Sequence, residues 1–220
     1  MKVKLISYST PTEEFIDDGI DNAQELVAFC ARVSNPANQL NTETSEKLIN
    51  YLIKNAHWSP LEMVSACLEI ETTRDIARQI LRHRSFSFQE FSQRYANPVK
   101  DLEFVTREAR LQDPNNRQNS IENDDKEISD TWIEKQENLI KNAKETYNWA
   151  IENGIAKEQA RAVLPEGNTV SRMYMNGTLR SWIHYIELRS GNGTQQEHMD
   201  IAVACAEVIT KIFPMSKNLN

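Results

Sequence analysis

The chain has 220 residues, of which 40% are hydrophobic and 26% charged, and this is the composition of an ordinary folded globular protein. Its formal net charge of −7 argues against a general nucleic-acid binder, which usually carries a basic surface. No apolar run approaches the roughly 18 residues of a membrane span. The N-terminal "MKVKLISYST" has no signal-peptide core, so we expect a cytoplasmic protein without a membrane partner.

The first half of the chain predicts two strands and three helices. Apolar and polar residues alternate in 1–8 and 63–71, as they do in half-buried strands. Apolar residues recur at helical spacing in 22–34, 44–57 and 74–84. The side chains that these helices are predicted to turn inward are Leu26, Val27, Cys30, Leu48, Tyr51, Leu52, Ile76, Ala77, Ile80 and Leu81.

The middle of the chain predicts a third strand and one long helix. Residues 101–108 form the predicted strand, and 111–130 are polar, acidic and nearly free of apolar residues. We interpret 111–130 as a surface excursion. Residues 131–154 then predict an amphipathic helix that ends at Gly154. Its predicted inward side chains are Trp132, Ile133, Leu139, Ile140, Ala143, Tyr147 and Ile151.

The last part of the chain predicts further helices. A short helix over 157–165 stops at a proline, and 169–189 is helical only in its second half. Thr194 and Glu197 have capping-box spacing ahead of a final helix, and Thr73 is placed to cap the helix that follows it. Because there is no internal repeat and no linker, these elements predict one α+β domain.

Cysteine and histidine predict neither a disulfide nor a metal site. The three cysteines are far apart, odd in number and set in apolar segments, which predicts buried, reduced thiols. The four histidines have no metal-ligand spacing, so we predict no metal. The cysteines are Cys30, Cys67 and Cys205, and the histidines are His57, His83, His184 and His198.

Arginine is concentrated in two windows, 74–94 and 161–189, that contain no lysine. The guanidinium group binds phosphate bidentately and stacks on flat rings, so the windows predict a site for a compact polyanion such as a nucleotide or dinucleotide. The alternative is a set of weak surface ion pairs, which is strongest for Arg74, Arg78 and Arg172. The nine arginines are Arg74, Arg78, Arg82, Arg84, Arg94, Arg161, Arg172, Arg180 and Arg189.

The first window has a second notable feature, a set of polar side chains between the arginines. Gln79, Arg82 and His83 are predicted to share one face of a helix, because they lie at positions i, i+3 and i+4. The following residues are predicted to form a loop rich in hydroxyl and amide donors: Ser85, Ser87, Ser92 and Gln93. Glu90 is a lone carboxylate there. It either accepts a ribose hydroxyl or holds an arginine in place, such as Arg94 at i+4.

In the stretch "RHRSFSFQEFSQRY" at 82–95, seven residues separate Arg-His-Arg from Ser92, and the stretch resembles the signature of the flavin-dependent thymidylate synthases. Four more segments are similar to that family in order and approximate spacing. They are "HWSPLE" at 57–62, "ARAVLP" at 160–165, "LRSWIHYIELR" at 179–189 and "QQEHMDIA" at 195–202. The resemblance implies a single domain over 1–220 with a mixed or antiparallel sheet flanked by long helices.

The resemblance also implies an enzyme that converts dUMP to dTMP by reductive methylation. Methylenetetrahydrofolate would donate the carbon, FAD would carry the hydride and NADPH would be the reductant. The family further implies a homotetramer with active sites between subunits, no nucleic-acid partner, and a cytoplasmic location, in the host cytoplasm for a virus-encoded chain.

The family's binding residues carry over to positions of this chain. The implied dUMP residues are Gln79, Arg82, Glu90, Phe91, Ser92, Gln93, Arg94, Arg161 and Arg189, with Phe91 and Gln93 acting mainly through backbone groups. The implied FAD residues are His57, Ser59, Arg82, His83, Arg84, Ser85, Glu90, Thr178, Leu179, Arg180 and His184. Three positions depart from the family's common residues, namely Met63, Gln89 and Thr178.

The residues also bear on mechanism. No cysteine has an arginine-rich, polar setting, so a cysteine nucleophile is not expected. By resemblance, Arg189 is catalytic: it favours the N3-deprotonated uracil and pushes electron density toward C5.

Ser92 has no general base nearby in the sequence, so we interpret it as a hydrogen-bond donor. His83 is expected to be a neutral donor rather than a proton shuttle, because arginines flank it. His184 could instead be a core histidine, since "SWIHYI" is apolar.

A binding module for single-stranded nucleic acid is the alternative function. Phe86, Phe88, Phe91 and Tyr95 alternate with the arginines and could stack bases. The sequence pI near 5.2 counts against it.

Overall fold

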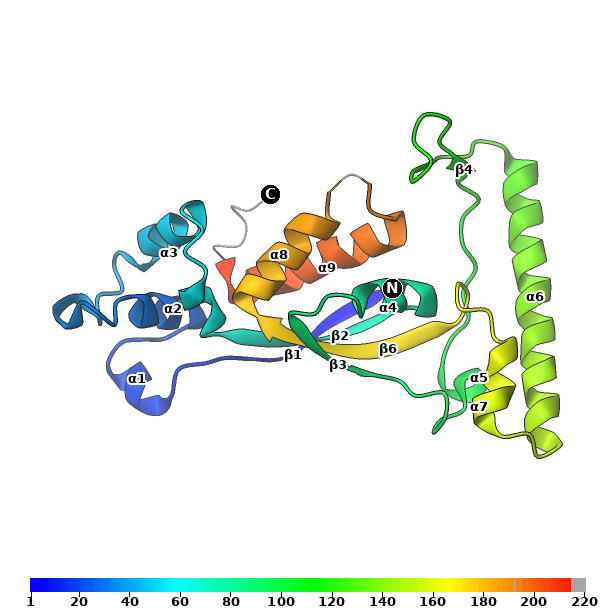
Figure 1. Ribbon diagram of the computed structural model, residues 1–220, viewed down its shortest axis with the longest axis horizontal. Helices are drawn as coiled ribbons and strands as arrows, with labels where there is room; N and C mark the ends of the chain where they lie inside the picture. Colours follow the sequence, from blue (N-terminus) through cyan, green and yellow to red (C-terminus); the bar gives the residue numbers. More distant parts are fainter. Residues whose placement is uncertain (192, 215–220) are drawn as a thin grey trace.

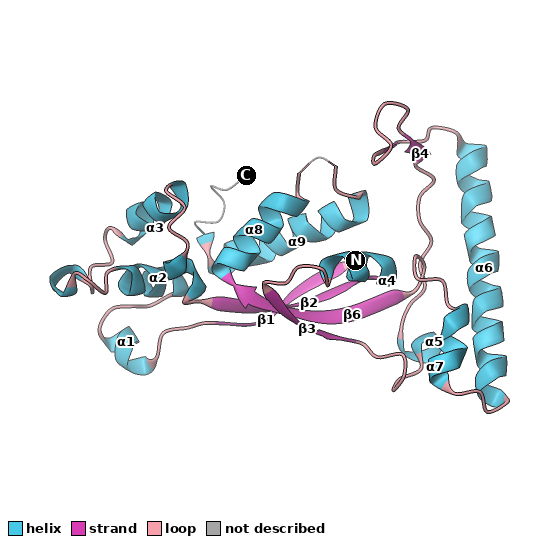
Figure 2. Cartoon of the chain, viewed as in Figure 1, coloured by secondary structure: helices cyan, strands magenta, loops and turns pink. Residues whose placement is uncertain are grey.

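Four antiparallel strands form the centre of the fold in the computed structural model, which describes residues 1–191 and 193–214 (Figures 1 and 2). The strand order is β1-β2-β6-β3. The bounds are β1 Lys2–Tyr8, β2 Ser65–Thr73, β6 Val170–Thr178 and β3 Phe86–Glu90. The expected strands at 1–8 and 63–71 are therefore confirmed, as is the α+β class.

The two faces of the sheet differ in polarity because side chains alternate along each strand. On β2, Leu68 and Ile70 are buried, whereas Glu69 and Glu71 point to the other face. Glu71 pairs there with Arg172 at 2.7 Å. That face is polar, so the core must form on the opposite side.

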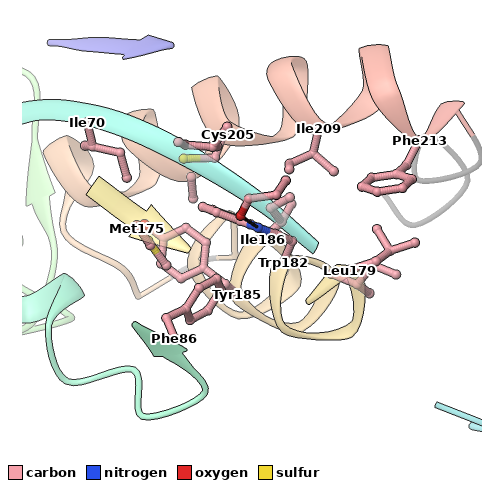
Figure 3. Close-up of a cluster of buried hydrophobic side chains, with 14 of the residues drawn as sticks. Ile70, Phe86, Met175, Leu179, Trp182, Tyr185, Ile186, Cys205, Ile209 and Phe213 are labelled. Atoms are coloured by element: carbon pink, nitrogen blue, oxygen red, sulfur yellow. Dashed lines mark hydrogen bonds between the residues drawn. The ribbon is translucent and has the colours of Figure 1, made fainter. Parts of the chain in front are cut away.

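Helices α8 (Leu179–Arg189) and α9 (Gln196–Ile212) cover the apolar face of the sheet (Figure 1). Trp182 lies fully buried between them and the sheet, and its indole N–H donates to the carbonyl of Ala66 at 3.0 Å. Figure 3 shows the buried cluster around it. The labelled members of this cluster are Ile70, Phe86, Met175, Leu179, Trp182, Tyr185, Ile186, Cys205, Ile209 and Phe213.

The N-terminal helices extend this core beyond one end of the sheet. They are α1 Glu13–Asp17, α2 Ala23–Ala31, η1 Pro36–Asn38, α3 Ser45–Lys54 and η2 Ser59–Glu62. The prediction that Tyr51 faces inward was wrong, since Tyr51 is 56% exposed and Ile49 is buried in its place. Helix α3 packs on α2 through the stripe that contains Ile49 and Leu52, and Tyr51 lies outside it.

Helix α4 (Arg74–Ile80) is shorter than predicted, and β3 follows it after a turn. The shared helical face of Gln79, Arg82 and His83 was therefore wrong. The predicted loop was wrong for Ser87, which lies in β3, but right for Ser85, which lies in the turn before it. Pairing of 86–90 with β6 satisfies the backbone better than a loop could, which explains the strand. Thr73 does precede α4, but its hydroxyl donates to Asp75 at 2.7 Å instead of capping the helix.

The elements beyond the other end of the sheet surround one long helix. They are α5 Pro98–Asp101, β4 Leu111–Gln112, β5 Ser120–Ile121, α6 Lys126–Glu152, α7 Lys157–Ala160 and η3 Arg161–Val163. The predicted strand at 101–108 was wrong, because only Phe104 forms an isolated bridge, with Thr169. The excursion at 111–130 contains the β4–β5 hairpin and the start of α6, which Asp125 caps.

Helix α6 buries only part of its predicted apolar face. Ile140, Ala143 and Tyr147 are buried as predicted, but the predicted inward residues Trp132, Ile133 and Leu139 are exposed. In Figure 1 the helix stands beside the sheet, and only its C-terminal part lies against α5 and α7. Among the described residues, the predicted inward side chains of this part of α6 thus stay partly open to solvent.

Two further predictions need correction. Helix α9 begins at Gln196 with Gln195 at the N-cap, so Thr194 forms no capping box with Glu197. Cys205 is buried as predicted, but Cys30 and Cys67 are only half-buried; all three are free thiols. In the described part of the chain, no helix is long and apolar enough to cross a membrane.

Candidate active site

The first group of predicted site residues lies where α4, α8 and α9 meet. Arg189, in the last turn of α8, donates its Nε–H to Nε2 of His83 at 3.0 Å. Because Nε2 accepts this bond, His83 is neutral with its proton on Nδ1. Burial lowers the pKa of His83, and the charges of Arg189 and Arg82 lower it further. Gln79 completes the group and donates to the side-chain oxygen of Gln195 at 2.8 Å.

Glu90, the carboxylate between the arginines, is held by residues distant in sequence. It accepts from the Ser171 hydroxyl at 2.8 Å and pairs with Arg78 at 3.0 Å and Arg74 at 3.7 Å. The suggested pairing with Arg94 at i+4 was wrong, because β3 ends at Glu90 and the chain turns away. Arg74 is not a weak surface ion pair either, since it is 9% exposed.

The second group lies next to α7 and η3. Arg94 pairs with Glu158 of α7 at 3.3 Å, and Lys157 donates to the backbone carbonyl of Tyr95 at 2.8 Å. Gln93 is 3% exposed, and its side-chain nitrogen has no hydrogen-bond partner among the described residues. Arg161 opens η3 in the same neighbourhood, so this segment brings together Ser92, Gln93, Arg94 and Arg161.

Some of the residues implied for FAD lie at the N-terminal end of α8, whereas His83 contacts Arg189 at the C-terminal end of that helix and Glu90 contacts Ser171 at the start of β6. Thr178 caps the helix by accepting the Ser181 N–H at 3.3 Å, and the Ser181 hydroxyl donates to the carbonyl of Ser85 at 3.1 Å. Arg180 pairs with Glu62, just after Ser59 in the η2 segment. Leu179 is buried, so only its backbone can meet a ligand.

Two histidines flank this helix end. The rings of His184 and Trp58 contact edge to face with centroids 4.4 Å apart, and the ring of His57 lies 5.9 Å from that of Tyr51. His184 is half-buried rather than enclosed in the core. Its core-histidine alternative is therefore wrong, and both histidines are accessible at the same end of α8.

Three of the predicted ligand-binding arginines have no internal counterion. Among residues 1–191 and 193–214, the guanidinium groups of Arg82, Arg84 and Arg161 have neither a carboxylate nor a hydrogen-bond partner. Arg189 contacts a neutral histidine rather than a carboxylate. Such uncompensated cations fit a phosphorylated ligand, because phosphate oxygens can accept from each guanidinium fork.

A single chain does not bring together the two groups of residues that the resemblance implies for dUMP. No hydrogen bond or ion pair in the described structure joins Gln79, His83 or Arg189 to Ser92, Arg94 or Arg161. Figure 1 agrees, since α8 and α9 cover the sheet while α7 lies beyond its end beside α6. Each group therefore forms only part of a site.

Four supporting residues each contact a predicted site residue from a distant segment, and these contacts were not predicted: Ser171, Glu158, Trp58 and Glu62. Trp58 and Glu62 lie in the family-like segment at 57–62, which was recognised, but nothing in that segment named their partners. Ser171 and Glu158 had no local signal, because an ordinary serine or glutamate gives no hint of its partner. No group of three or more His, Cys, Asp or Glu that could hold a metal occurs within the described residues.

The nucleic-acid alternative is not supported by the aromatic residues. Phe86 is buried in the core, with its ring 4.8 Å from that of Trp182, and Phe88 and Phe91 are half-buried. Only Tyr95 is open, at 83% exposure. A base-stacking surface needs several exposed rings along one groove, and this segment offers one.

Comparison with known proteins decides between the two functions. Residues 16–215 match the model of the family described as thymidylate synthase complementing protein. The chain is 50% identical over 214 residues to a probable flavin-dependent thymidylate synthase of Paramecium bursaria Chlorella virus 1, an alignment that covers 97% of this chain and 96% of that protein. It belongs to this family.

Two other relatives agree. A flavin-dependent thymidylate synthase of Synechocystis is 47% identical over 215 residues, which cover 97% of this chain and 96% of that one. A crystal structure of a UMP/dUMP methylase, PolB from Streptomyces cacaoi, bound with 5-Br dUMP, superposes with a TM-score of 0.82 at 25% identity, over 99% of this chain and 93% of that chain. The predictions of the family, its fold, an enzyme and a flavin cofactor are confirmed at the level of the family.

Proposed function

We propose that this member of the flavin-dependent thymidylate synthase family converts dUMP to dTMP in the cytoplasm. Methylenetetrahydrofolate is the carbon donor, FAD the hydride carrier and NADPH the reductant. The observation that carries the proposal is the set of guanidinium groups at family motif positions that lack an internal counterion, namely those of Arg82, Arg84 and Arg161. The names of the relatives support thymidylate synthesis with a flavin. The carbon donor and the reductant are part of the proposal.

The two ligands are assigned to the residue sets that the family motif implies. For dUMP these are Gln79, Arg82, Glu90, Phe91, Ser92, Gln93, Arg94, Arg161 and Arg189. For FAD they are His57, Ser59, Arg82, His83, Arg84, Ser85, Glu90, Thr178, Leu179, Arg180 and His184. The position of Thr178, Leu179 and Arg180 at the N-terminal end of α8 supports the assignment, because a helix N-terminus favours phosphate.

Arg189 is the proposed catalytic residue. Its Nε is bonded to His83, which fixes the guanidinium plane and leaves the two Nη groups to face the pyrimidine. A fixed cation at the pyrimidine edge favours the N3-deprotonated form and makes C5 more nucleophilic. Arg189 acts through charge and not as a base, because a guanidinium group stays protonated in proteins.

The cysteines do not suit a nucleophilic role in this reaction. Burial raises the pKa of Cys205 far above its usual range, and burial also raises the pKa of Cys30 and Cys67. The thiolate, which is the attacking species, is therefore disfavoured at each position. When bound, FAD supplies the hydride that completes the methyl group. The protein's part is to position dUMP and to stabilise its charge.

We further propose that the active sites form between chains of a homotetramer. The two dUMP-binding groups lie apart in one chain, and each offers cations without a complete pocket. A second copy can bring its Arg94 and Arg161 to the Gln79 and Arg189 of the first. The exposed apolar residues of α6, among them Trp132 and Leu139, support assembly, because large apolar side chains are usually covered.

Replacing Arg189 tests the function. We expect Arg189→Ala to abolish dTMP formation, measured by product analysis with NADPH oxidation followed in the presence and absence of dUMP. The purified variant should remain yellow, with flavin absorbance at about 450 nm. Arg172→Ala is the matched control, since Arg172 pairs with Glu71 on the polar face of the sheet. Full activity in Arg189→Ala would overturn the assignment.

A further inference from the structure

A line of polar contacts runs from the base of the β4–β5 hairpin to the proposed nucleotide site. Arg110 donates to the Ser120 hydroxyl at 3.1 Å with its Nε and to a carboxylate oxygen of Glu197 with an Nη group. The other oxygen of Glu197 accepts from the Gln195 side chain at 2.9 Å. Gln195 in turn accepts from Gln79 at 2.8 Å. The Gln79 oxygen then faces Nδ1 of His198 at 3.2 Å.

The direction of every bond in this line follows from its first two members. Arg110 can only donate, and an ionised Glu197 can only accept. Burial opposes ionisation of Glu197, but hydrogen bonds from its own backbone N–H and from Gln195 and Arg110 outweigh it and lower its pKa. Gln195 must therefore present its NH₂ group to Glu197 and its oxygen to Gln79.

The same logic sets the last two members. Since Gln195 presents an oxygen, Gln79 must present its NH₂ group there and its own oxygen to His198. His198 must then donate from Nδ1, which leaves Nε2 unprotonated. Nε2 is buried and has no hydrogen-bond partner among the described residues. With the proton on Nδ1, no buried N–H donor of this ring is left without an acceptor. The chain of contacts thus fixes which way the Gln79 amide points.

We propose that Arg110, Glu197, Gln195 and His198 are positioning residues that hold the Gln79 amide in one orientation for dUMP binding. This inference rests on the proposed function, in which Gln79 contacts dUMP. It also gives the hairpin a role, because Arg110 joins the hairpin residue Ser120 to Glu197. Without the constraint, the amide can turn over and offer the wrong group to the nucleotide.

Glu197→Gln removes the constraint with little change in shape. The new amide can present either nitrogen or oxygen to Gln195, so Gln195 and Gln79 are free to turn over. We expect the Kd for dUMP, measured by calorimetry on the FAD-loaded enzyme, to rise about tenfold, which is the loss of about one good hydrogen bond. Flavin content and Tm should not change. Glu207→Gln, an exposed carboxylate on the same helix, is the matched control and should bind dUMP normally.

His198 provides a second pair of variants that separates positioning from packing. Asparagine can place an N–H donor near the position of Nδ1, whereas leucine cannot. We expect His198→Asn to bind dUMP within about twofold of the wild type and His198→Leu to bind it about tenfold more weakly. A purely structural role would not be rescued by asparagine, which is smaller than histidine.

A double-mutant cycle tests whether the effect passes through Gln79. In a Gln79→Leu background, Glu197→Gln should weaken dUMP binding no further. An equal loss with and without Gln79, or wild-type affinity in both Glu197→Gln and His198→Leu, would overturn the inference and leave the proposed function intact. Failure of the wild-type enzyme to bind dUMP would overturn the proposed function and this inference with it.

Discussion

Burial sets the protonation state of His198, whose side chain is 0% exposed. Desolvation lowers its pKa to about 4, with smaller contributions from Arg189 and His83. The ring is therefore neutral in the folded protein throughout the physiological range. This agrees with the Nδ1–H tautomer that its contact with Gln79 requires, because that tautomer is a neutral form.

The stability of the protein should depend on pH through His198. A histidine in the unfolded chain has a pKa of about 6.5. Between about pH 6.5 and 4 the unfolded chain therefore binds a proton on the His198 ring, whereas the folded chain does not. The contribution of His198 to the free energy of unfolding is thus constant above about pH 6.5. It decreases as the pH is lowered from there, by up to about 3 kcal/mol. We expect the difference in unfolding free energy between wild type and His198→Asn to show this slope in denaturant titrations.

A pH-independent difference between wild type and His198→Asn would contradict this prediction. The comparison cancels the carboxylates, which titrate in both proteins. His83, whose pKa is also lowered, is likewise common to both and does not confound the difference.

At the scale of elements, the sequence predicted those strands and helices whose buried face is continuous within one chain. Alternation at 63–71 was readable because Leu68 and Ile70 face a core made by the same chain. Strand β3 was missed because its outward residues belong to a polar, functional motif. The helix around Trp132 and Ile133 was predicted correctly, but the inward orientation of these two side chains was wrong, because periodicity identifies an apolar stripe and not the surface that covers it.

Prediction of the site was limited in the same way, because a local pattern does not identify contacts between distant segments. Positions such as Arg82, Arg94 and Arg189 were proposed because the short segments that contain them resemble family motifs. The contacts that hold these groups join segments far apart in sequence, such as Ser171 with Glu90 and Glu158 with Arg94. Such pairs depend on the register of β3 on β6 and on the placement of α7, which no local pattern encodes.

The pairing of β3 with β6 depends on Gly177. This residue lies opposite Phe86, and a Cβ at position 177 would approach the Phe86 ring to 2.4 Å. We expect Gly177→Ala to displace Phe86 from its contact with Trp182 and to destabilise the fold by about 1–3 kcal/mol. Thermal denaturation measures the loss.

A companion substitution makes this test specific. In Gly177→Ala/Phe86→Leu the smaller side chain leaves room for the new methyl group, so part of the lost stability should return. If Gly177→Ala melts at the wild-type temperature, the close approach of Phe86 does not constrain the strand pair.

At the scale of the whole molecule, the proposed division of the dUMP site between chains can be tested with tetramers that contain two different variants. If Arg161 and Arg189 of one site come from different chains, Arg161→Ala and Arg189→Ala should each be inactive alone but recover activity when co-expressed. Random mixing should restore roughly a quarter of the sites, because half of the chains supply each intact arginine. dTMP formation by the purified mixture is the measurement.

Two controls accompany this experiment. Sedimentation should give a mass four times the 25.4 kDa of the chain for every variant. Mixing the two proteins after separate purification, without subunit exchange, should restore nothing. A co-expressed tetramer with no activity would mean that each chain supplies both arginines to the same site.

The direct passage of β6 into α8 has a consequence for the geometry of catalysis. Thr178 is both the last residue of the strand and the N-cap of the helix, so no flexible loop separates sheet and helix. Arg180 and Arg189 therefore stand about 14 Å apart along one rigid axis, at 1.5 Å per residue. Under the proposed function, this helix fixes the distance between the arginine assigned to the cofactor and the arginine assigned to the pyrimidine. Inserting one residue into the helix would rotate Arg189 by about 100° around the helix axis. All the side chains would still be present, but Arg189 would no longer point in the direction it has now.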